Sequence, residues 1–297
     1  MGPPGGGAVT AALAIDTDEE VRCQACGAVR AYTFKYAKNG CDIFECSSCG
    51  LGRTQVGAFD PGAYYNESYF SGGHTDGYAD YRGAESVLRR EFAGTVDFIR
   101  RFCPAGKLIE LGCAYGFFLQ EAKRHFDVAG VELAAEAAAH CREQGLNVVT
   151  GLADEPTLSA LGRADVFVLL DVIEHLPDPY ETLRLCVQHL NPGGSIVITT
   201  GDFASPVAKL TGKSWRLMTP PQHLWFFTPE SMKRMSARLG LSVQAIEHPW
   251  KLVPFSLLLF QLRRIAGLKV ARSEKGSGIG IPVNLFDAMR IVLRKPS

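Results

Sequence analysis

The chain has 297 residues, 46% of them hydrophobic and 21% charged, and these values suit a globular protein with a substantial core. Basic and acidic residues number 31 each, so the formal net charge is zero. This balance argues against a protein that holds nucleic acid through an overall basic surface. The longest apolar run, residues 252–260, contains Pro254 and falls short of the roughly 18 residues of a membrane-spanning helix. We therefore expect a cytoplasmic protein without a transmembrane segment.

Changes of composition along the chain predict four parts. Residues 1–20 are rich in glycine and proline and lack a basic start, so we expect a disordered lead-in and not a signal peptide. Residues 21–57 hold five cysteines, four of them in two Cys-x-x-Cys pairs, and residues 58–104 combine an aromatic, glycine-containing stretch with an amphipathic helix at 86–102. The main domain is expected to cover residues 105–297.

From residue 105 onward, short apolar runs alternate with stretches of helical periodicity. This alternation is typical of an α/β fold in which a parallel sheet is covered by helices on both faces. We expect strands at residues 107–111, 128–132, 147–150, 166–170, 195–200, 241–247 and 288–294. The predicted helices cover residues 117–125, 134–144, 180–190, 229–239 and 255–265, and a turn at 191–194 ends the third of them.

Two Cys-x-x-Cys pairs stand in the second part of the chain, separated by 19 residues. This spacing is that of a zinc ribbon, in which each pair supplies two vertices of a tetrahedron of thiolates. The predicted ligands are Cys23, Cys26, Cys46 and Cys49. A shell closed by four cysteines leaves no position for a substrate, so we expect structural Zn²⁺. Cys41 lies near the pairs and is an alternative ligand in a less regular site.

A glycine-containing loop follows the first predicted strand of the main domain. The dinucleotide-binding pattern Gly-x-Gly-x-x-Gly is not met, because Ala114 and Phe117 occupy its second and third glycine positions. The sequence pattern of a phosphate-binding loop, which residues 212–214 could end, is not met either, because Val207 stands where this pattern requires a glycine.

The loop instead resembles the first motif of class I S-adenosylmethionine-dependent methyltransferases, which has an acid followed by alternating glycines. Here the motif comprises Glu110, Gly112, Ala114 and Gly116, with alanine in place of the middle glycine. The resemblance continues in order through residues 130–132, 171–178 and 191–194. With the cysteines in front and residues 223–228 behind, the chain is similar to bacterial methyltransferases of sugar, glycan and secondary-metabolite pathways. This resemblance implies a Rossmann-like fold with a seven-stranded, mostly parallel sheet and a small N-terminal zinc ribbon.

The resemblance also implies where S-adenosylmethionine binds. Glu132 ends a predicted strand 20 residues after Gly112, where an acid can accept hydrogen bonds from both ribose hydroxyls. Glu110 is expected near the cofactor's ammonium group. The other residues expected to line the cofactor are Gly112, Cys113, Ala114, Gly116, Leu133, Leu152, Ala153 and Asp171.

Methyl transfer to a hydroxyl needs a positioned acceptor and a group that removes its proton. His175 follows the fourth predicted strand and His223 lies in a loop expected over the same edge, so both are candidate bases. Residues 64–81 are interpreted as a lid or, alternatively, as a linker packed on the core. Residues 251–268 are interpreted as a buried helix, an acceptor-pocket wall or a peripheral membrane contact.

The sequence favours a methyltransferase that acts on a hydroxyl of a sugar, glycan or related small metabolite. One alternative is an RNA methyltransferase that uses the ribbon as its reader, although the neutral charge and the scarcity of basic residues in the ribbon argue against it. The other is a non-catalytic interaction protein on a degenerate methyltransferase fold. No nucleic acid is expected as a partner. The methylated atom and the oligomeric state stay open.

Overall fold

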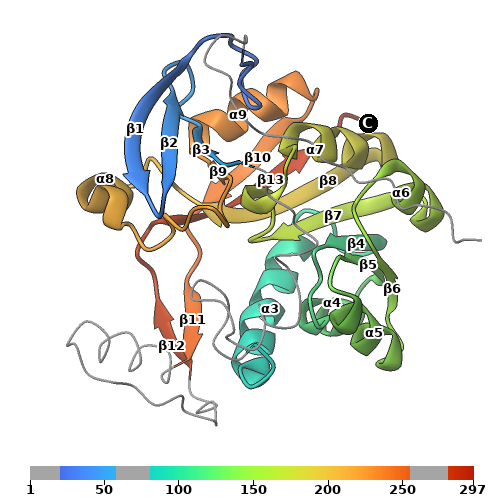
Figure 1. Cartoon of the computed structure of the whole chain (residues 1–297). Helices are drawn as coiled ribbons and strands as arrows, with labels where there is room; N and C mark the ends of the chain where they lie inside the picture. The colour runs from blue at the N-terminus through green and yellow to red at the C-terminus, as the bar shows by residue number, and fades with distance from the viewer. Residues whose placement is uncertain (1–20, 58–80, 255–279) are drawn as a thin grey trace, which may run out of the picture.

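The structure is a computed structural model, and it describes residues 21–57, 81–254 and 280–297. A seven-stranded sheet forms its centre, with β4 to β8 parallel and β13 antiparallel to both of its neighbours (Figure 1). In spatial order the strands are β10 (Ser242–Glu247), β13 (Ala288–Arg294), β8 (Leu190–Gly201), β7 (Ala164–Leu170), β4 (Lys107–Leu111), β5 (Asp127–Glu132) and β6 (Asn147–Thr150). The expected α/β fold with a seven-stranded, mostly parallel sheet is confirmed.

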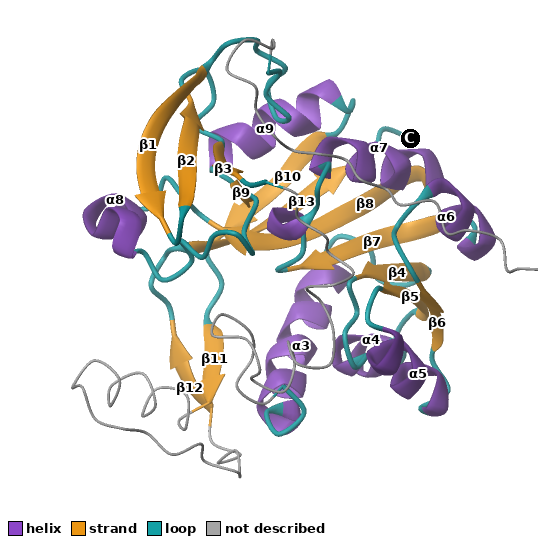
Figure 2. Cartoon of the chain, in the orientation of Figure 1, coloured by secondary structure: helices purple, strands orange, loops and turns teal. Residues whose placement is uncertain are grey.

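Helices cover both faces of this sheet (Figure 2). One face carries α3 (Glu85–Arg100), α4 (Phe117–Ala122) and α5 (Ala135–Glu143), and the other carries α6 (Glu155–Leu161), α7 (Pro179–His189) and α9 (Pro229–Arg238). In β4, Leu108 packs into one core cluster and its neighbour Ile109 into another. Because side chains alternate along a strand, continuously apolar runs are buried on both sides.

The chain changes direction across the sheet at β4. It runs from β4 to β5 and β6 on one side, then returns to β7 on the other side of β4. Ligands of open α/β sheets bind at the carboxyl ends of the strands beside such a reversal. The residues that follow β4, β5 and β7 are therefore placed together at one edge.

A second sheet joins the N-terminal part of the chain to the main domain. It consists of β1 (Tyr32–Lys38), β2 (Cys41–Cys46), β3 (Gly52–Gln55) and β9 (Trp225–Phe226), all antiparallel. The short strand β9 comes from the segment that follows β8. The cysteine-rich module and the segment that carries His223 are thus parts of one sheet.

Some features differ from the sequence-based expectation. The predicted turn at 191–194 is a bulge inside β8, because Ala164 pairs with Leu190 and Val166 pairs with Ser195. Such an irregularity accommodates Pro192, which has no N–H to donate to a regular ladder. The sequence does not predict β11 (Lys251–Pro254), β12 (Gly280–Val283), α8 (Pro206–Thr211) or the 3-10 turns η1 (Ile173–His175) and η2 (Gly212–Ser214).

Two predicted features cannot be compared with the structure. The helix expected at 255–265 and most of the aromatic stretch 64–81 lie outside the described residues. Within the described ranges, no helix combines the length and the apolar character needed to cross a membrane.

Candidate functional site

The loop after β4 follows a tight, partly left-handed path. Gly112, Ala114 and Gly116 have φ angles of 70°, 46° and 75°. A β-carbon on Gly112 would lie 2.7 Å from Cγ2 of Val172, which follows β7. Glycine is therefore required where this loop approaches the end of β7, and it keeps the backbone accessible to a ligand.

Glu132 lies at the end of β5 and is 5% exposed. Its two carboxylate oxygens accept hydrogen bonds from the backbone N–H groups of Ala114 at 2.7 Å and Ala134 at 2.8 Å. Burial raises the pKa of Glu132, and these backbone bonds oppose the shift. The residue fixes the loop, and each oxygen keeps acceptor capacity for a further donor.

Glu110 lies on β4 beneath the same loop and is 3% exposed. Its Oε2 has no hydrogen-bond partner in the described part of the chain. Burial, with smaller contributions from Cys141 and Glu132, raises the pKa of Glu110 well above its usual range. A buried oxygen of this kind is stabilised by a cationic or hydrogen-bonding ligand.

The other predicted cofactor residues surround this edge. Cys113 is buried and its N–H donates to the Val131 carbonyl, and Leu133 directly follows Glu132. Leu152 is 47% exposed and follows β6 with Ala153. The N–H of Gly151 donates to the carbonyl of Glu132, so this segment and the end of β5 are neighbours.

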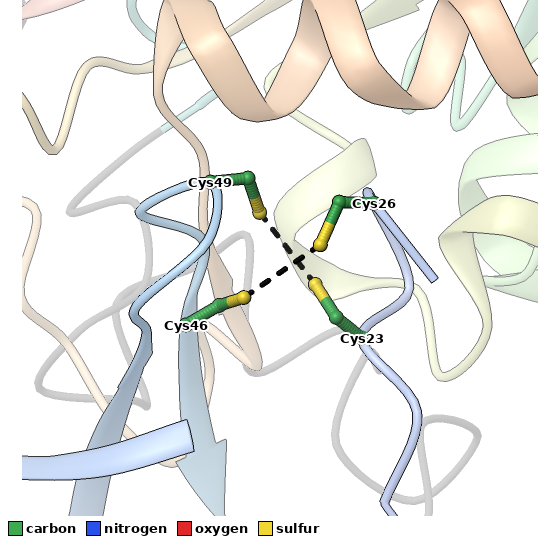
Figure 3. Close-up of side chains that lie close together, drawn as sticks. All are labelled: Cys23, Cys26, Cys46 and Cys49. Atoms are coloured by element: carbon green, nitrogen blue, oxygen red, sulfur yellow. Dashed lines mark hydrogen bonds between the residues drawn. The ribbon is translucent and has the colours of Figure 1, made fainter. Parts of the chain in front are cut away.

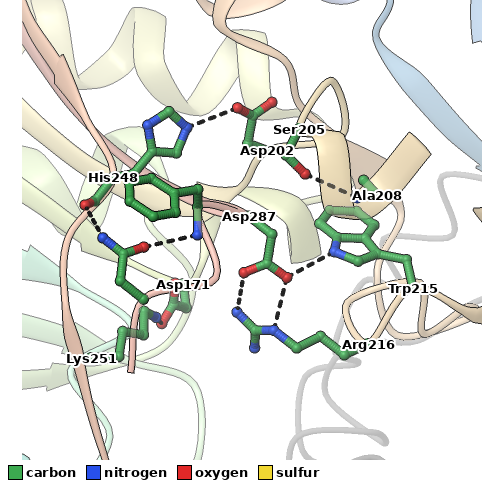
Figure 4. Close-up of polar contacts among 11 residues, drawn as sticks. Asp171, Asp202, Ser205, Ala208, Trp215, Arg216, His248, Lys251 and Asp287 are labelled. Carbon is green, nitrogen blue, oxygen red and sulfur yellow. Dashed lines mark hydrogen bonds and ion pairs between the residues drawn. The ribbon is translucent and has the colours of Figure 1, made fainter. Parts of the chain in front are cut away.

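Asp171 follows β7 with a φ of 55° and has partners that the sequence does not suggest. Its carboxylate lies 2.6 Å from Nζ of Lys251 (Figure 4). It also accepts a hydrogen bond from the Thr199 hydroxyl at 3.1 Å. Although burial opposes ionisation, the Lys251 ammonium lowers the pKa of Asp171. In the sequence, Lys251 is recognisable only as the start of an apolar segment.

A cavity of about 470 Å³ lies beside this pair. Its lining includes Asp171 and Lys251 together with the end of β7, part of α3 and the segment before β11. The charged lining also comprises Arg90, Glu91, Glu247 and Arg290. A larger hollow between α6 and α7 lies away from the glycine loop, and its Arg184 and Glu181 side chains pair with each other.

His175 and His223 meet at the same edge. Their ring centroids are 4.7 Å apart at an interplanar angle of 76°. Nδ1 of His175 lies 3.0 Å from the Gln222 carbonyl oxygen, and Nδ1 of His223 lies 2.8 Å from that of Leu217. A carbonyl oxygen only accepts, so both Nδ1 atoms donate, and in the neutral rings Nε2 carries the lone pair.

Burial lowers the pKa of both rings, to about 4 for His175 and to about 3 for His223. Both histidines are therefore neutral at pH 7. Both stay candidate bases, because a neutral imidazole can accept a proton.

Glu174 is not among the residues predicted from the sequence, although it precedes His175. It is 4% exposed, and its Oε2 has no hydrogen-bond partner in the described ranges. Burial and the nearby Asp171 charge raise the pKa of Glu174 to about 8. One ligand atom from each of Glu174, His175 and His223 lies within 4.8 Å of the others.

The four predicted cysteine ligands converge (Figure 3). The Sγ atoms of Cys23 and Cys49 are 3.6 Å apart, and those of Cys26 and Cys46 are 3.7 Å apart. These separations exceed a disulfide bond and approach the edge of about 3.8 Å in a tetrahedron with Zn–S bonds near 2.3 Å. Cys41 lies outside this cluster, and its thiol points to the Asn39 carbonyl.

The amino-acid sequence is similar to one protein family and to curated methyltransferases. The family described as a methyltransferase domain matches residues 85–246. The ubiquinone biosynthesis O-methyltransferase of Methylococcus capsulatus is 27% identical over 154 residues, which are 48% of this chain and 65% of that protein. The enzyme of the same name from Caulobacter vibrioides is 30% identical over 150 residues, which are 46% of this chain and 60% of that protein. The match spans less than two thirds of either relative.

Two solved structures share the fold. A methyltransferase from Archaeoglobus fulgidus described as dependent on S-adenosylmethionine is 21% identical, with a TM-score of 0.50 and coverage of 71% of this chain and 97% of that chain. Magnesium protoporphyrin IX methyltransferase from Synechocystis, solved with bound S-adenosylhomocysteine, is 10% identical, with a TM-score of 0.50 and coverage of 78% and 99%. At these identities the likeness concerns the fold.

Proposed function

We propose that this chain, which belongs to the methyltransferase domain family and is a class I S-adenosylmethionine-dependent methyltransferase, methylates a hydroxyl oxygen of a small, polar acceptor such as a sugar or glycan. The observation that carries the proposal is the convergence of the glycine loop, Glu132 and two neutral histidines at one sheet edge. The names of the two bacterial O-methyltransferases support oxygen as the acceptor atom.

The residues at this edge fit S-adenosylmethionine. Glu132 would accept hydrogen bonds from the ribose hydroxyls with the acceptor capacity that the two backbone amides leave. The Oε2 of Glu110, which has no hydrogen-bond partner among the described residues, would face the ammonium group. The exposed side chain of Leu152 would cover one side of the adenine. When bound, the cofactor supplies a methyl group on a sulfonium, which is an electrophile for in-line displacement.

We assign the acceptor end of the site to the two histidines and to the cavity beside Asp171. A hydroxyl beside the His175–His223 pair would give its proton to the Nε2 lone pair of His223, which the Nδ1 contact with the Leu217 carbonyl does not use. The cavity's charged side chains suit an acceptor with several hydroxyls, and Trp250, 66% exposed in its lining, offers a ring face to a sugar.

We further propose that Cys23, Cys26, Cys46 and Cys49 hold one structural Zn²⁺. The support is the four-thiolate donor set at near-tetrahedral spacing. This ion would stabilise the small sheet and take no part in methyl transfer.

The test of the function is transfer of a labelled methyl group from S-adenosylmethionine to a panel of sugars, phenols and quinols, with RNA as a further acceptor. We expect label on a hydroxyl of a polar acceptor, and a loss of turnover of roughly 10²–10⁴ in His223→Ala with unchanged affinity for S-adenosylhomocysteine. Label in RNA would support the alternative function, an RNA methyltransferase that recognises RNA through the zinc ribbon. Cofactor binding without transfer to any hydroxyl would overturn the proposal.

A further inference from the structure

We propose that Lys251 and Asp171 form a specificity subsite that binds two adjacent hydroxyl groups of a neutral acceptor. Asp171 directly follows β7, and Lys251 begins β11, 80 residues further along the chain. In the folded chain the Nζ of Lys251 lies 2.6 Å from a carboxylate oxygen of Asp171 (Figure 4). Both residues line the cavity of about 470 Å³. The assignment of this subsite to the methyl acceptor rests on the proposed function, whereas the binding of hydroxyl groups does not.

The surrounding chain fixes both charged groups in place. The backbone N–H of Asp171 donates to the carbonyl and the hydroxyl oxygens of Thr199, both at 3.0 Å. On the other side of the pair, the backbone N–H of Leu252 donates to the Glu91 carboxylate of α3 at 2.8 Å, which anchors the start of β11. The pair is therefore positioned by the fold, and such preorganisation lowers the entropic cost of binding a ligand.

Both members of the pair are charged at pH 7. Although burial favours the neutral amine, the carboxylates of Asp171 and Glu91 raise the pKa of Lys251. Burial likewise opposes ionisation of Asp171, but the Lys251 ammonium lowers its pKa. The Lys251 side chain is 27% exposed and that of Asp171 is 39% exposed, so a ligand in the cavity can reach both.

The pair has unused hydrogen-bonding capacity of both kinds. An ammonium has three N–H donors, and among the described residues the Lys251 ammonium donates to Asp171 alone. The carboxylate oxygens of Asp171 accept one hydrogen bond from Thr199 and one from Lys251, and each oxygen keeps a further lone pair. One hydroxyl can therefore accept from the ammonium while its neighbour donates to the carboxylate.

The charge balance of the pair favours a neutral ligand. A ligand anion would be repelled by Asp171 and a ligand cation by Lys251, because the two charges lie side by side. Trp250, which is 66% exposed and lines the same cavity, offers its ring face to the carbon framework that carries the hydroxyls. A ring with two adjacent hydroxyl groups fits both features.

The subsite lies beside the glycine loop. Val172 directly follows Asp171, and its Cγ2 would lie 2.7 Å from a β-carbon added to Gly112. A ring held by Lys251 and Asp171 would therefore be placed next to the loop on which the cofactor would bind. The two residues would select and orient the acceptor.

The test compares the binding of two pairs of ring compounds that differ by one hydroxyl, cis-cyclohexane-1,2-diol with cyclohexanol and catechol with phenol. Each compound is titrated into full-length protein in the presence of S-adenosylhomocysteine, and binding is followed by ligand-observed nuclear magnetic resonance. We expect the diol to bind about tenfold or more tightly in at least one pair, because its second hydroxyl adds a hydrogen bond to a charged group. Preference in the first pair indicates a sugar-like diol, and preference in the second indicates a phenolic one.

Lys251→Met and Asp171→Asn should each remove most of the diol preference, whereas Lys251→Arg should retain much of it because charge and N–H donors remain. Lys35→Met is the matched control, since Lys35 also pairs with a carboxylate, that of Glu45, and its side chain is 30% exposed. Thermal melting and calorimetry with S-adenosylhomocysteine show that each variant is folded. Equal affinity for diol and single alcohol in both pairs, or a diol preference that survives in Lys251→Met, overturns the subsite.

Methyl transfer, measured on the same samples, separates this inference from the proposed function. A diol preference that depends on Lys251, without transfer to any hydroxyl of the acceptor panel, overturns the proposed function and leaves the subsite in place. Transfer to hydroxyl acceptors without a diol preference overturns the subsite alone.

Discussion

At the scale of single residues, Glu132 joins the glycine loop to the end of β5 through two backbone hydrogen bonds. On the proposed function, Glu132→Ala would deprive the ribose hydroxyls of a charged acceptor, at a cost of roughly 1.5–3 kcal/mol. We expect affinity for S-adenosylhomocysteine to fall by roughly 10- to 150-fold in calorimetry. Glu143→Ala is the control, because Glu143 is exposed at the end of α5. Equal affinity in both variants would remove Glu132 from the cofactor site.

Gly116 is a residue-scale test of the loop's packing. A β-carbon there would lie 2.6 Å from Cδ1 of Leu146 and 2.8 Å from Sγ of Cys141, at a φ of 75°. Gly145 has nearly the same φ, 72°, but a β-carbon added to it would meet no atom of the described residues within 4 Å. Both alanine variants meet backbone strain of about 1 kcal/mol, and Gly116→Ala adds roughly 1–3 kcal/mol of overlap.

The measurement is urea-induced unfolding of the two variants side by side. We expect Gly116→Ala to be clearly less stable than Gly145→Ala and to bind the cofactor product more weakly. Equal losses of stability would show that the loop relaxes around the added methyl group.

At the scale of elements, Asp287 connects the start of β13 to the segment after η2 (Figure 4). Its carboxylate accepts hydrogen bonds from the Arg216 guanidinium at 2.8 and 2.9 Å and from the Trp215 indole at 2.9 Å. Burial opposes ionisation, but Arg216 and Trp215 lower the pKa of Asp287. The contact therefore stabilises the fold when Asp287 is ionised.

Asp287→Asn should lower the free energy of unfolding at pH 7 by about 1.5–3 kcal/mol, because the bonds to a charged group are weakened. A depressed pKa in the folded state gives stability that is fully present above the unfolded value of about 3.9 and lost as pH falls through the folded value. Parent and variant should therefore converge below about pH 4 in denaturant titrations at a series of pH values. A stability difference that stays constant down to pH 2 would contradict this assignment.

At the scale of the whole molecule, the cysteine module holds the segment that carries His223. Thr54 of β3 donates from its backbone N–H to the Leu224 carbonyl at 2.9 Å and from its hydroxyl to the His223 carbonyl at 2.6 Å. The Thr228 hydroxyl donates to the Cys49 carbonyl at 3.0 Å. Unfolding of the module would therefore displace His223 more than Glu132.

Cys49→Ser should remove most of the zinc, lower the melting temperature and reduce turnover more than it weakens binding of the cofactor product. Cys41→Ser is the matched control, since Cys41 lies outside the cluster. Metal analysis, thermal melting and calorimetry on the two variants provide the readouts. Less than about half an equivalent of zinc in the parent protein, purified without chelators, would contradict the structural ion.

The local patterns of the sequence determined most of the main sheet and part of the site. The limits of β4, β6 and β13 agree with the predicted strands at 107–111, 147–150 and 288–294, because short, mostly apolar runs between turns suit buried strands. The glycine loop and the two cysteine pairs were found because each motif is defined by spacing within a short segment.

Only the tertiary structure decided which distant residues meet. The pairing of β3 with β9, the contact of Lys251 with Asp171 and the grouping of Glu174 with His223 join segments that no local pattern links. The low pKa values of His175 and His223 likewise come from burial by the surrounding chain. Spacing along the sequence specifies local geometry, whereas long-range contacts and desolvation depend on how the whole chain packs.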